Sequence, residues 1–79
     1  MEIHVRFFAA AREAAARETE RLELEGAADV GALARELERR YPALAGLDLR
    51  FAVGGRFAPA ATTLADGDEV ALVPPVSGG

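Results

Sequence analysis

The residues best suited to chemistry in this 79-residue sequence are the last two, Gly78 and Gly79. They follow Pro74-Pro75-Val76-Ser77, and the two prolines lack the N–H groups that would continue a β-ladder. An extended segment of this length reaches roughly 20 Å, and glycine has no side chain to obstruct a narrow channel. Residues 74–79 are therefore predicted to form an extended, flexible tail that carries a terminal carboxylate into a second protein. The alternative is a frayed chain end.

A carboxylate must be activated before it can react. Adenylation by ATP on a second protein would convert the Gly79 carboxylate into an acyl adenylate. A sulfur nucleophile would then leave a thiocarboxylate or thioester. This chemistry suits a chain without Cys, because the sulfur is held on Gly79 itself. The ATP belongs to the activating enzyme, so no cofactor is expected on this chain.

The remaining composition excludes several classes of site and partner. His4 is the only histidine and all basic residues are Arg, which excludes a His-pair metal site, a Schiff base and a Walker-type lysine. The arginines are interleaved with glutamates in a chain of net charge −4, so we expect no nucleic-acid partner. No apolar run approaches the roughly 18 residues of a membrane span, and no signal peptide is recognisable. The expected location is the cytoplasm.

No catalytic constellation is visible in the expected domain. The one serine, Ser77, lies in the tail, and His4 has no nucleophile near it in the sequence. Asp66-Gly67-Asp68 resembles a paired-carboxylate or cation site but is fully explained as a turn. We therefore predict no metal site, and a subunit whose reaction is catalysed by residues of a partner.

Hydrophobic periodicity predicts the strands that must position the tail. Alternation favours a strand over residues 2–8 and an antiparallel second strand over 19–25. Gly54-Gly55 predicts a hairpin between short strands at 50–53 and 56–58, the latter at a sheet edge. Residues 69–73 are apolar on both faces after the first position, which is typical of a central strand or of one that contacts a partner.

Two helices are predicted between these strands. The Ala-rich residues 9–17 favour a short helix, in which Glu13 and Arg17 are expected to pair at i,i+4. Asp29 is a suitable N-cap for a longer amphipathic helix that ends near Tyr41.

The charged face of the longer helix is expected to be exposed to solvent, with Glu36 and Arg40 paired at i,i+4. Pro42 stops this helix, and the irregular connection after it is expected to cover the core with Leu44 and Leu47.

Together these elements predict one α+β domain over residues 1–73, with the long helix packed across one face of a mixed sheet. This is the ubiquitin-like β-grasp arrangement, in which the first and last strands lie side by side in the centre. The strand order itself does not follow from the pattern.

Three further side chains each have two interpretations. Phe8 falls on the polar face of the first strand, where it is either covered by the following helix or exposed to a partner. Phe57 lies near a sheet edge and is either core or part of an exposed apolar patch. Arg12, at i,i+4 from Phe8, either orders the tail or a partner, or is simply solvated.

Taken together, three stretches resemble the MoaD family, the small ubiquitin-like subunits of molybdopterin synthase. They are Val5-Arg6-Phe7-Phe8-Ala9 followed by Arg12-Glu13, then Asp66-Gly67-Asp68-Glu69-Val70, then Pro74-Pro75-Val76-Ser77-Gly78-Gly79. The resemblance spans essentially the whole chain, in the right order and at the right length.

The resemblance implies a sulfur carrier of molybdenum cofactor biosynthesis. In that family an E1-like, ATP-dependent adenylyltransferase (MoeB-like) adenylates the C-terminal glycine, and a sulfurtransferase makes the thiocarboxylate. The tail then enters the large, MoaE-like subunit, whose residues transfer the sulfur to cyclic pyranopterin monophosphate. Two carriers and two large subunits form a heterotetramer.

The resemblance also implies residue roles. Gly79 bears the sulfur and Gly78 supports passage through the channel. The other partner-binding residues are Phe8, Arg12, Phe57, Val73, Pro74, Pro75, Val76 and Ser77. Two alternatives remain open, a thiamin-type (ThiS-like) sulfur carrier and a ubiquitin-like protein modifier or binding module. The thiamin-type carriers lack the Phe-Phe-Ala…Arg-Glu start.

Overall fold

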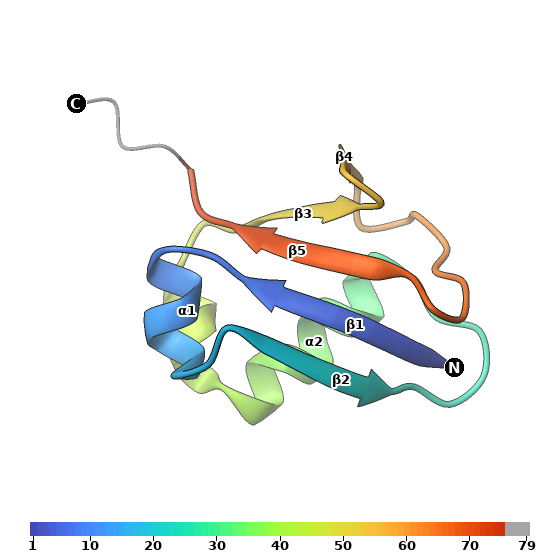
Figure 1. The fold of residues 1–79 in the computed structure, drawn as a ribbon, viewed down its shortest axis with the longest axis horizontal. Coiled ribbons are helices and arrows are strands. Elements are labelled where there is room, and N and C mark those ends of the chain that lie inside the picture. Colours follow the sequence, from blue (N-terminus) through green and yellow to red (C-terminus); the bar gives the residue numbers. More distant parts are fainter. Residues whose placement is uncertain (76–79) are drawn as a thin grey trace.

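A five-stranded mixed sheet carries one long helix across one face (Figure 1). The computed structural model describes residues 1–75. The strands are β1 (Glu2–Phe7), β2 (Thr19–Glu23), β3 (Arg50–Val53), β4 (Arg56–Phe57) and β5 (Glu69–Val73). Their spatial order is β2-β1-β5-β3-β4, with β1 and β5 parallel and the other neighbours antiparallel. The expected α+β β-grasp arrangement, with the first and last strands side by side in the centre, is confirmed.

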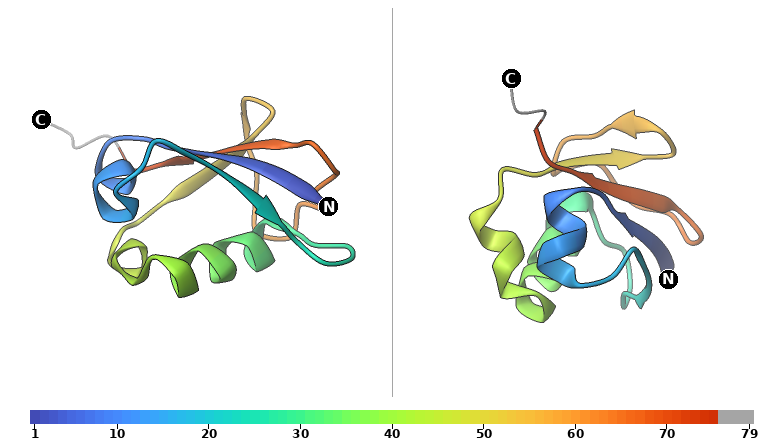
Figure 2. Two further views of the ribbon diagram at one scale, coloured as in Figure 1. Left: turned by 60° about the horizontal axis from the view of Figure 1, so that its bottom comes forward. Right: turned by 60° about the vertical axis from the view of Figure 1, so that its left-hand side comes forward.

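The helical elements all lie on one side of this sheet. They are α1 (Ala10–Ala15), α2 (Val30–Arg40) and the short 3-10 helix η1 (Pro42–Gly46). Figure 2 shows α2 running beneath the strands, with α1 near its C-terminal end. The connection after Pro42 was expected to be irregular but is this 3-10 helix. Leu44 is buried as expected, and Leu47 is partly buried against the core.

The core lies between the sheet and α2. Alternate residues of β1 and β5 face inward, and α2 supplies one apolar stripe at helical spacing. The fully buried large side chains are Ile3, Val5, Leu22, Leu33, Leu37, Leu44, Val70 and Leu72. Burial of this inner face fixes the register of β5, because a slip of one residue would turn its apolar side chains outward.

The predicted N-terminus of α2 is confirmed. The Asp29 carboxylate accepts a hydrogen bond from the Ala32 N–H at 2.8 Å, which satisfies one of the amides that a helix leaves unpaired. The N–H groups of Val30 and Gly31 donate to carbonyls of the segment before β5, at 3.0 and 2.9 Å. The start of α2 is therefore attached to the segment that leads into the central strand.

Several predicted bounds were too long. The helix expected over 9–17 ends at Ala15, because Ala16 adopts a left-handed conformation with φ 57°. The predicted pair between Glu13 and Arg17 is wrong, since Arg17 lies beyond the helix and pairs with Glu20 at 2.5 Å. The strands expected over 2–8, 19–25 and 56–58 end at residues 7, 23 and 57.

Candidate functional site

The predicted tail begins where β5 ends. Val73 is the last residue of this strand, and Pro74 and Pro75 lie outside any strand, as the missing N–H of proline requires. On one side β5 pairs with β1, and on the other Arg50 of β3 is the partner of Val73. The origin of the tail is thus fixed by a strand held from both sides. The predicted roles of Val76, Ser77, Gly78 and Gly79 fall outside the described residues.

The outer face of the sheet, opposite α2, is apolar near this end. Ala71 and Val73 of β5 point to it, because Val70 and Leu72 point to the core. The register places Arg6 beside Ala71 on one flank and Arg50 beside Val73 on the other. On β4, Phe57 is the partner of Ala52 and shares the outer face with it.

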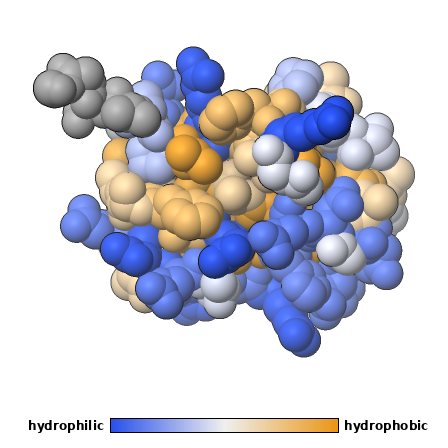
Figure 3. Space-filling model, turned by 45° about the horizontal axis from the view of Figure 1, so that its top comes forward, coloured by the Kyte–Doolittle hydropathy of each residue, from blue (hydrophilic) through white to orange (hydrophobic). Residues whose placement is uncertain are grey.

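Two phenylalanines are the large exposed apolar side chains of residues 1–75. Phe8 is 42% exposed and Phe57 is 62% exposed. Phe8 is therefore not covered by α1 and Phe57 is not part of the core; that a partner binds them stays a prediction. The Phe8 N–H donates to the Leu72 carbonyl at 3.2 Å, so its backbone is fixed to the strand that carries the tail. Figure 3 shows apolar surface close to the C-terminal end, bordered by hydrophilic groups.

Each exposed phenylalanine has an arginine over its ring. The Arg6 guanidinium carbon is 5.5 Å from the Phe8 centroid, and that of Arg50 is 5.7 Å from the Phe57 centroid, within the range of cation–π attraction. Arg50, Phe57, Val73, Pro74 and Pro75 line a hollow of about 350 Å³ where the tail leaves the sheet.

Arg12 takes part in an exposed ion pair. Its Nη1 lies 3.3 Å from Oε1 of Glu18, and it shares a second hollow of about 210 Å³ with Phe8. Exposed pairs of this kind contribute little to stability. Its expected role toward the tail or a partner stays a prediction.

The other candidate side chains have structural explanations. His4 Nε2 lies 2.9 Å from Oε1 of Glu2, on the surface. Asp66 and Gly67 form a turn, as predicted. The Asp68 carboxylate accepts a hydrogen bond from the Ala65 N–H at 2.8 Å within this segment, and the Asp66 carboxylate accepts one from the Glu2 N–H of β1 at 2.7 Å. Within residues 1–75 no group of three His, Cys, Asp or Glu side chains could hold a metal ion. No helix in this part of the chain is long and apolar enough to cross a membrane.

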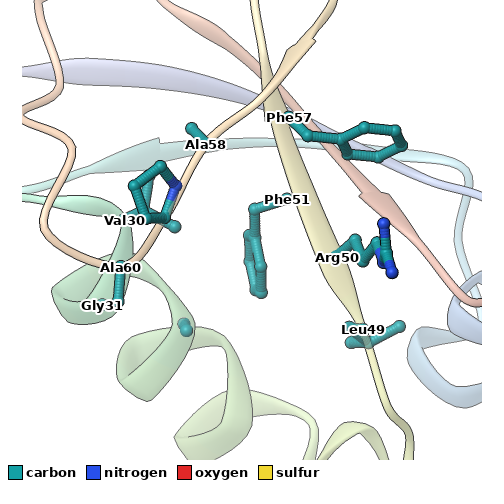
Figure 4. A pocket seen from close by; sticks show the side chains of 10 residues that line it. Val30, Gly31, Leu49, Arg50, Phe51, Phe57, Ala58 and Ala60 are labelled. Carbon is teal, nitrogen blue, oxygen red and sulfur yellow. The ribbon is translucent and has the colours of Figure 1, made fainter.

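A larger cavity adjoins the hollow at the end of β5, with which it shares Arg50 and Phe57. It has a volume of about 520 Å³ and opens between α2 and the β3–β4 hairpin (Figure 4). Its lining consists of Val30, Gly31, Ala34, Leu49, Arg50, Phe51, Phe57, Ala58, Pro59 and Ala60. Arg50 is the only ionisable residue among these, so the cavity lacks a pair of groups for proton transfer. We therefore place the functional site at the end of β5.

The mostly buried carboxylate of Glu20 was not predicted from the sequence. The side chain of Glu20 is 7% exposed and accepts hydrogen bonds from the Tyr41 hydroxyl, from Arg17 and from Arg40. The alternation of β2 places Glu20 on the same face as Leu22, and this is the signal that could have found it. Burial, followed by the hydrogen bond to Glu20, raises the pKa of Tyr41 above its usual value of 10.0.

On the solvent-exposed face of α2, Glu36 and Arg40 form the predicted ion pair. Glu36 Oε2 accepts from Arg40 at 2.9 Å, and both Glu36 oxygens accept from Arg39. These hydrogen bonds lower the pKa of the Glu36 carboxyl to about 2, and the hydrogen bond from Arg39 has the largest effect.

Comparison with known sequences gives matches along the whole chain. The profile of the ThiS family matches residues 5–79. The molybdopterin synthase sulfur carrier subunit of Mycobacterium tuberculosis is 39% identical over 82 residues, covering 100% of this chain and 99% of the relative. Small archaeal modifier protein 3 of Haloferax volcanii is 35% identical over 95 residues, covering both chains completely.

Solved structures match as well. A Pyrococcus furiosus protein described as a candidate subunit 1 of molybdopterin converting factor has a TM-score of 0.91 at 30% identity, covering 96% of this chain and 99% of that one. A chain in the Helicobacter pylori complex of subunits 1 and 2 of molybdopterin-converting factor has a TM-score of 0.70 at 28% identity, over 100% of both chains.

Proposed function

The chain belongs to the ThiS family, and on this basis we propose that it is a sulfur carrier, the small subunit of a molybdopterin synthase. The observation that carries the proposal is the position of β5. This strand is paired on both sides and ends at Val73, next to the exposed Phe57. A tail that starts there leaves from a fixed point beside an apolar surface. The family match extends over the tail to Gly79.

The proposed chemistry takes place on the Gly79 carboxylate. On an E1-like enzyme, a carboxylate oxygen attacks the α-phosphorus of ATP, which forms an acyl adenylate and releases pyrophosphate. Hydrosulfide from a sulfur donor then attacks the acyl carbon, the bond to AMP breaks, and the chain carries a thiocarboxylate. In the large subunit this group gives its sulfur to cyclic pyranopterin monophosphate, and the carboxylate is regenerated with an oxygen from water.

This chain contributes positioning to that sequence of steps. The rigid central strand sets the starting point of the tail, and the two prolines keep it out of the sheet. Gly78 and Gly79 present no side chain to the channel of the partner. The similarity to a chain of the Helicobacter pylori complex of subunits 1 and 2 supports a large, MoaE-like subunit as that partner.

Mass spectrometry of the intact protein tests the carrier function. The protein is incubated with an E1-like adenylyltransferase, ATP and a sulfur donor, and its mass is compared before and after. We expect the gain of one oxygen-to-sulfur exchange, localised to Gly79 by fragmentation. The variant that lacks Gly79 is the control. If full-length protein never gains this mass, the chain is not a sulfur carrier.

A protein modifier is the second candidate function, because Haloferax volcanii small archaeal modifier protein 3 covers the chain at 35% identity. A modifier would join its terminal carboxyl to lysine side chains of other proteins. Isopeptide adducts on target lysines, without a thiocarboxylate intermediate that loads the large subunit, would favour this function. Co-purification with a thiazole synthase rather than a MoaE-like subunit would instead indicate a thiamin-type carrier.

A further inference from the structure

The surface around the end of β5 differs in charge from the molecule as a whole. The chain has a net charge of −4, yet Arg6 and Arg50 are the residues that flank Ala71 and Val73 on the outer face. The glutamates that the strands place on that face lie toward its opposite end, where β1 and β5 begin and β2 ends: Glu2, Glu69 and Glu23. Glu18, which borders the hollow beside Arg6 and Phe8, is paired with Arg12 at 3.3 Å. The region from which the tail leaves is therefore apolar and basic.

Both arginines are held in place by aromatic rings. Arg6 lies over Phe8 and Arg50 lies over Phe57, at 5.5 and 5.7 Å from the ring centroids. A guanidinium stacked on a ring keeps N–H groups at its edge, where they can meet both oxygens of a carboxylate. Stacking also reduces the side-chain freedom that an arginine loses when it binds.

The charges of these arginines are not neutralised within the domain. Arg6 lies 3.5 Å from Glu69, but the two side chains are 53% and 61% exposed, and a pair so exposed to water is weak. In the part of the chain that the structure describes, Arg50 forms no ion pair. Arg50 thus has the greater capacity to bind an external carboxylate.

We infer that Arg6 and Arg50 determine partner specificity at this surface, and that the large subunit places carboxylates opposite them. Its apolar groups would cover Phe8, Phe57 and Val73 in the same interface. The inference rests on the proposed function, since it concerns the partner that receives the tail. Opposite charges at the rim of an interface accelerate association and exclude partners that present basic groups there.

Association kinetics with the purified large subunit test the inference. The variants Arg6→Glu and Arg50→Glu are compared with Arg35→Glu, which makes the same change of net charge on the exposed face of α2. At low ionic strength we expect the association rate constant to fall about tenfold or more for the first two variants, and distinctly less for the control. Their rate should also depend less on salt than that of the wild type.

Two milder variants separate the contribution of charge from that of the bidentate guanidinium contact. Arg50→Lys keeps the charge and should keep the salt dependence, although a lysine cannot make the bidentate contact. Arg50→Gln removes the charge without reversing it, and it carries the test if Arg50→Glu does not fold. Circular dichroism and thermal unfolding of each variant report whether the fold is intact.

The failure of this inference can be told apart from failure of the proposed function. If the wild type gains a thiocarboxylate and binds the large subunit, but Arg6→Glu and Arg50→Glu associate like Arg35→Glu, the inference is wrong and the function stands. If the wild type does not bind the large subunit at all, the proposed function and the inference both fail.

Discussion

At the scale of single residues, Phe7 and Phe8 show how one step along a strand changes the role of a side chain. Phe7 is 2% exposed and its ring meets that of Tyr41 edge-on, with the centroids 5.9 Å apart. Phe8 follows it and is 42% exposed. The same residue type thus contributes to stability at one position and is available to a partner at the next.

Alanine substitutions of the exposed Phe8 and Phe57 should weaken partner binding, whereas that of the buried Phe7 should lower stability. Phe8→Ala and Phe57→Ala should each weaken binding to the large subunit by about 2 kcal/mol or more, as expected of aromatic anchors, with the free energy of unfolding changed by no more than about 0.5 kcal/mol. Phe7→Ala, the internal control, should cost about 3–5 kcal/mol of stability. Calorimetric titration and urea unfolding give the two quantities. Unchanged affinity of Phe8→Ala would place Phe8 outside the interface.

Tyr41 gives stability a dependence on alkaline pH. Its pKa is raised above 10.0, mainly by burial and then by its hydrogen bond to Glu20. The fold therefore favours the neutral hydroxyl. This contribution is complete below pH 10.0 and is lost as the pH rises through the folded pKa. The chain has no Lys or Cys and one tyrosine, so no lysine, cysteine or second tyrosine titrates in the same range.

Urea unfolding of the wild type and Tyr41→Phe over this range measures the effect. The free energy of unfolding of the wild type should fall as the pH passes 10.0, and that of Tyr41→Phe should fall less. Tyrosinate absorbance follows the same group directly, because Tyr41 is the only tyrosine. Half-ionisation at or below pH 10.0 in the folded protein would contradict this account.

At the scale of elements, the start and length of α2 could be predicted from the sequence, but the end of α1 could not. The start of α2 is specified by Asp29 and its length by an apolar stripe that reaches Leu37. In α1 nearly all residues favour a helix equally, so its end depends on the left-handed turn at Ala16, which no glycine marks. Local sequence specifies an end only where a cap or a breaker is present.

The Asp29 cap should contribute measurably to the stability of the domain. Asp29→Ala removes the acceptor of the Ala32 N–H and should lower the free energy of unfolding by about 1 kcal/mol. Asp48→Ala makes the same change of charge at an exposed position in the loop before β3 and should have an effect within about 0.5 kcal/mol. Denaturant unfolding of the pair isolates the cap from the general effect of charge. Equal losses would show that the cap contributes nothing of its own.

At the scale of the whole molecule, the domain and its predicted tail should be energetically separate. Deletion of Gly79, or addition of one large residue after it, should abolish sulfur transfer because the terminus no longer fits or reaches the partner's active site. The melting temperature should remain nearly unchanged, since the strands end at Val73. Thermal unfolding and the thiocarboxylate assay measure the two effects. A large fall in melting temperature would show that the tail stabilises the fold.

The alternation of apolar and polar residues predicted which face of its strand some side chains of the candidate surface occupy. It did not predict which strands bring these side chains together. Alternation placed Phe8 on the outer side of the first strand, which Arg6 shares because it lies two residues earlier, and left the facing of Phe57 open. That Arg50 lies beside Val73, and that Phe57 lies over the same face, depends on the pairing of β3 with β5. Pairing between residues so far apart in sequence is set by the packed core rather than by local pattern.

Because β5 is both the last strand and a central one, a partly synthesised chain cannot complete the sheet. His4 is the partner of Glu69 and Phe7 that of Leu72, so the middle of the sheet closes only after nearly the whole domain has been translated. A chain interrupted before this point lacks the strand on which β1 and β3 both pair, and contacts of such long sequence separation form late. A chain that stops before β5 therefore lacks both the central strand of the sheet and the residues to which the proposed sulfur chemistry is assigned, and we expect it neither to fold nor to bind the partner.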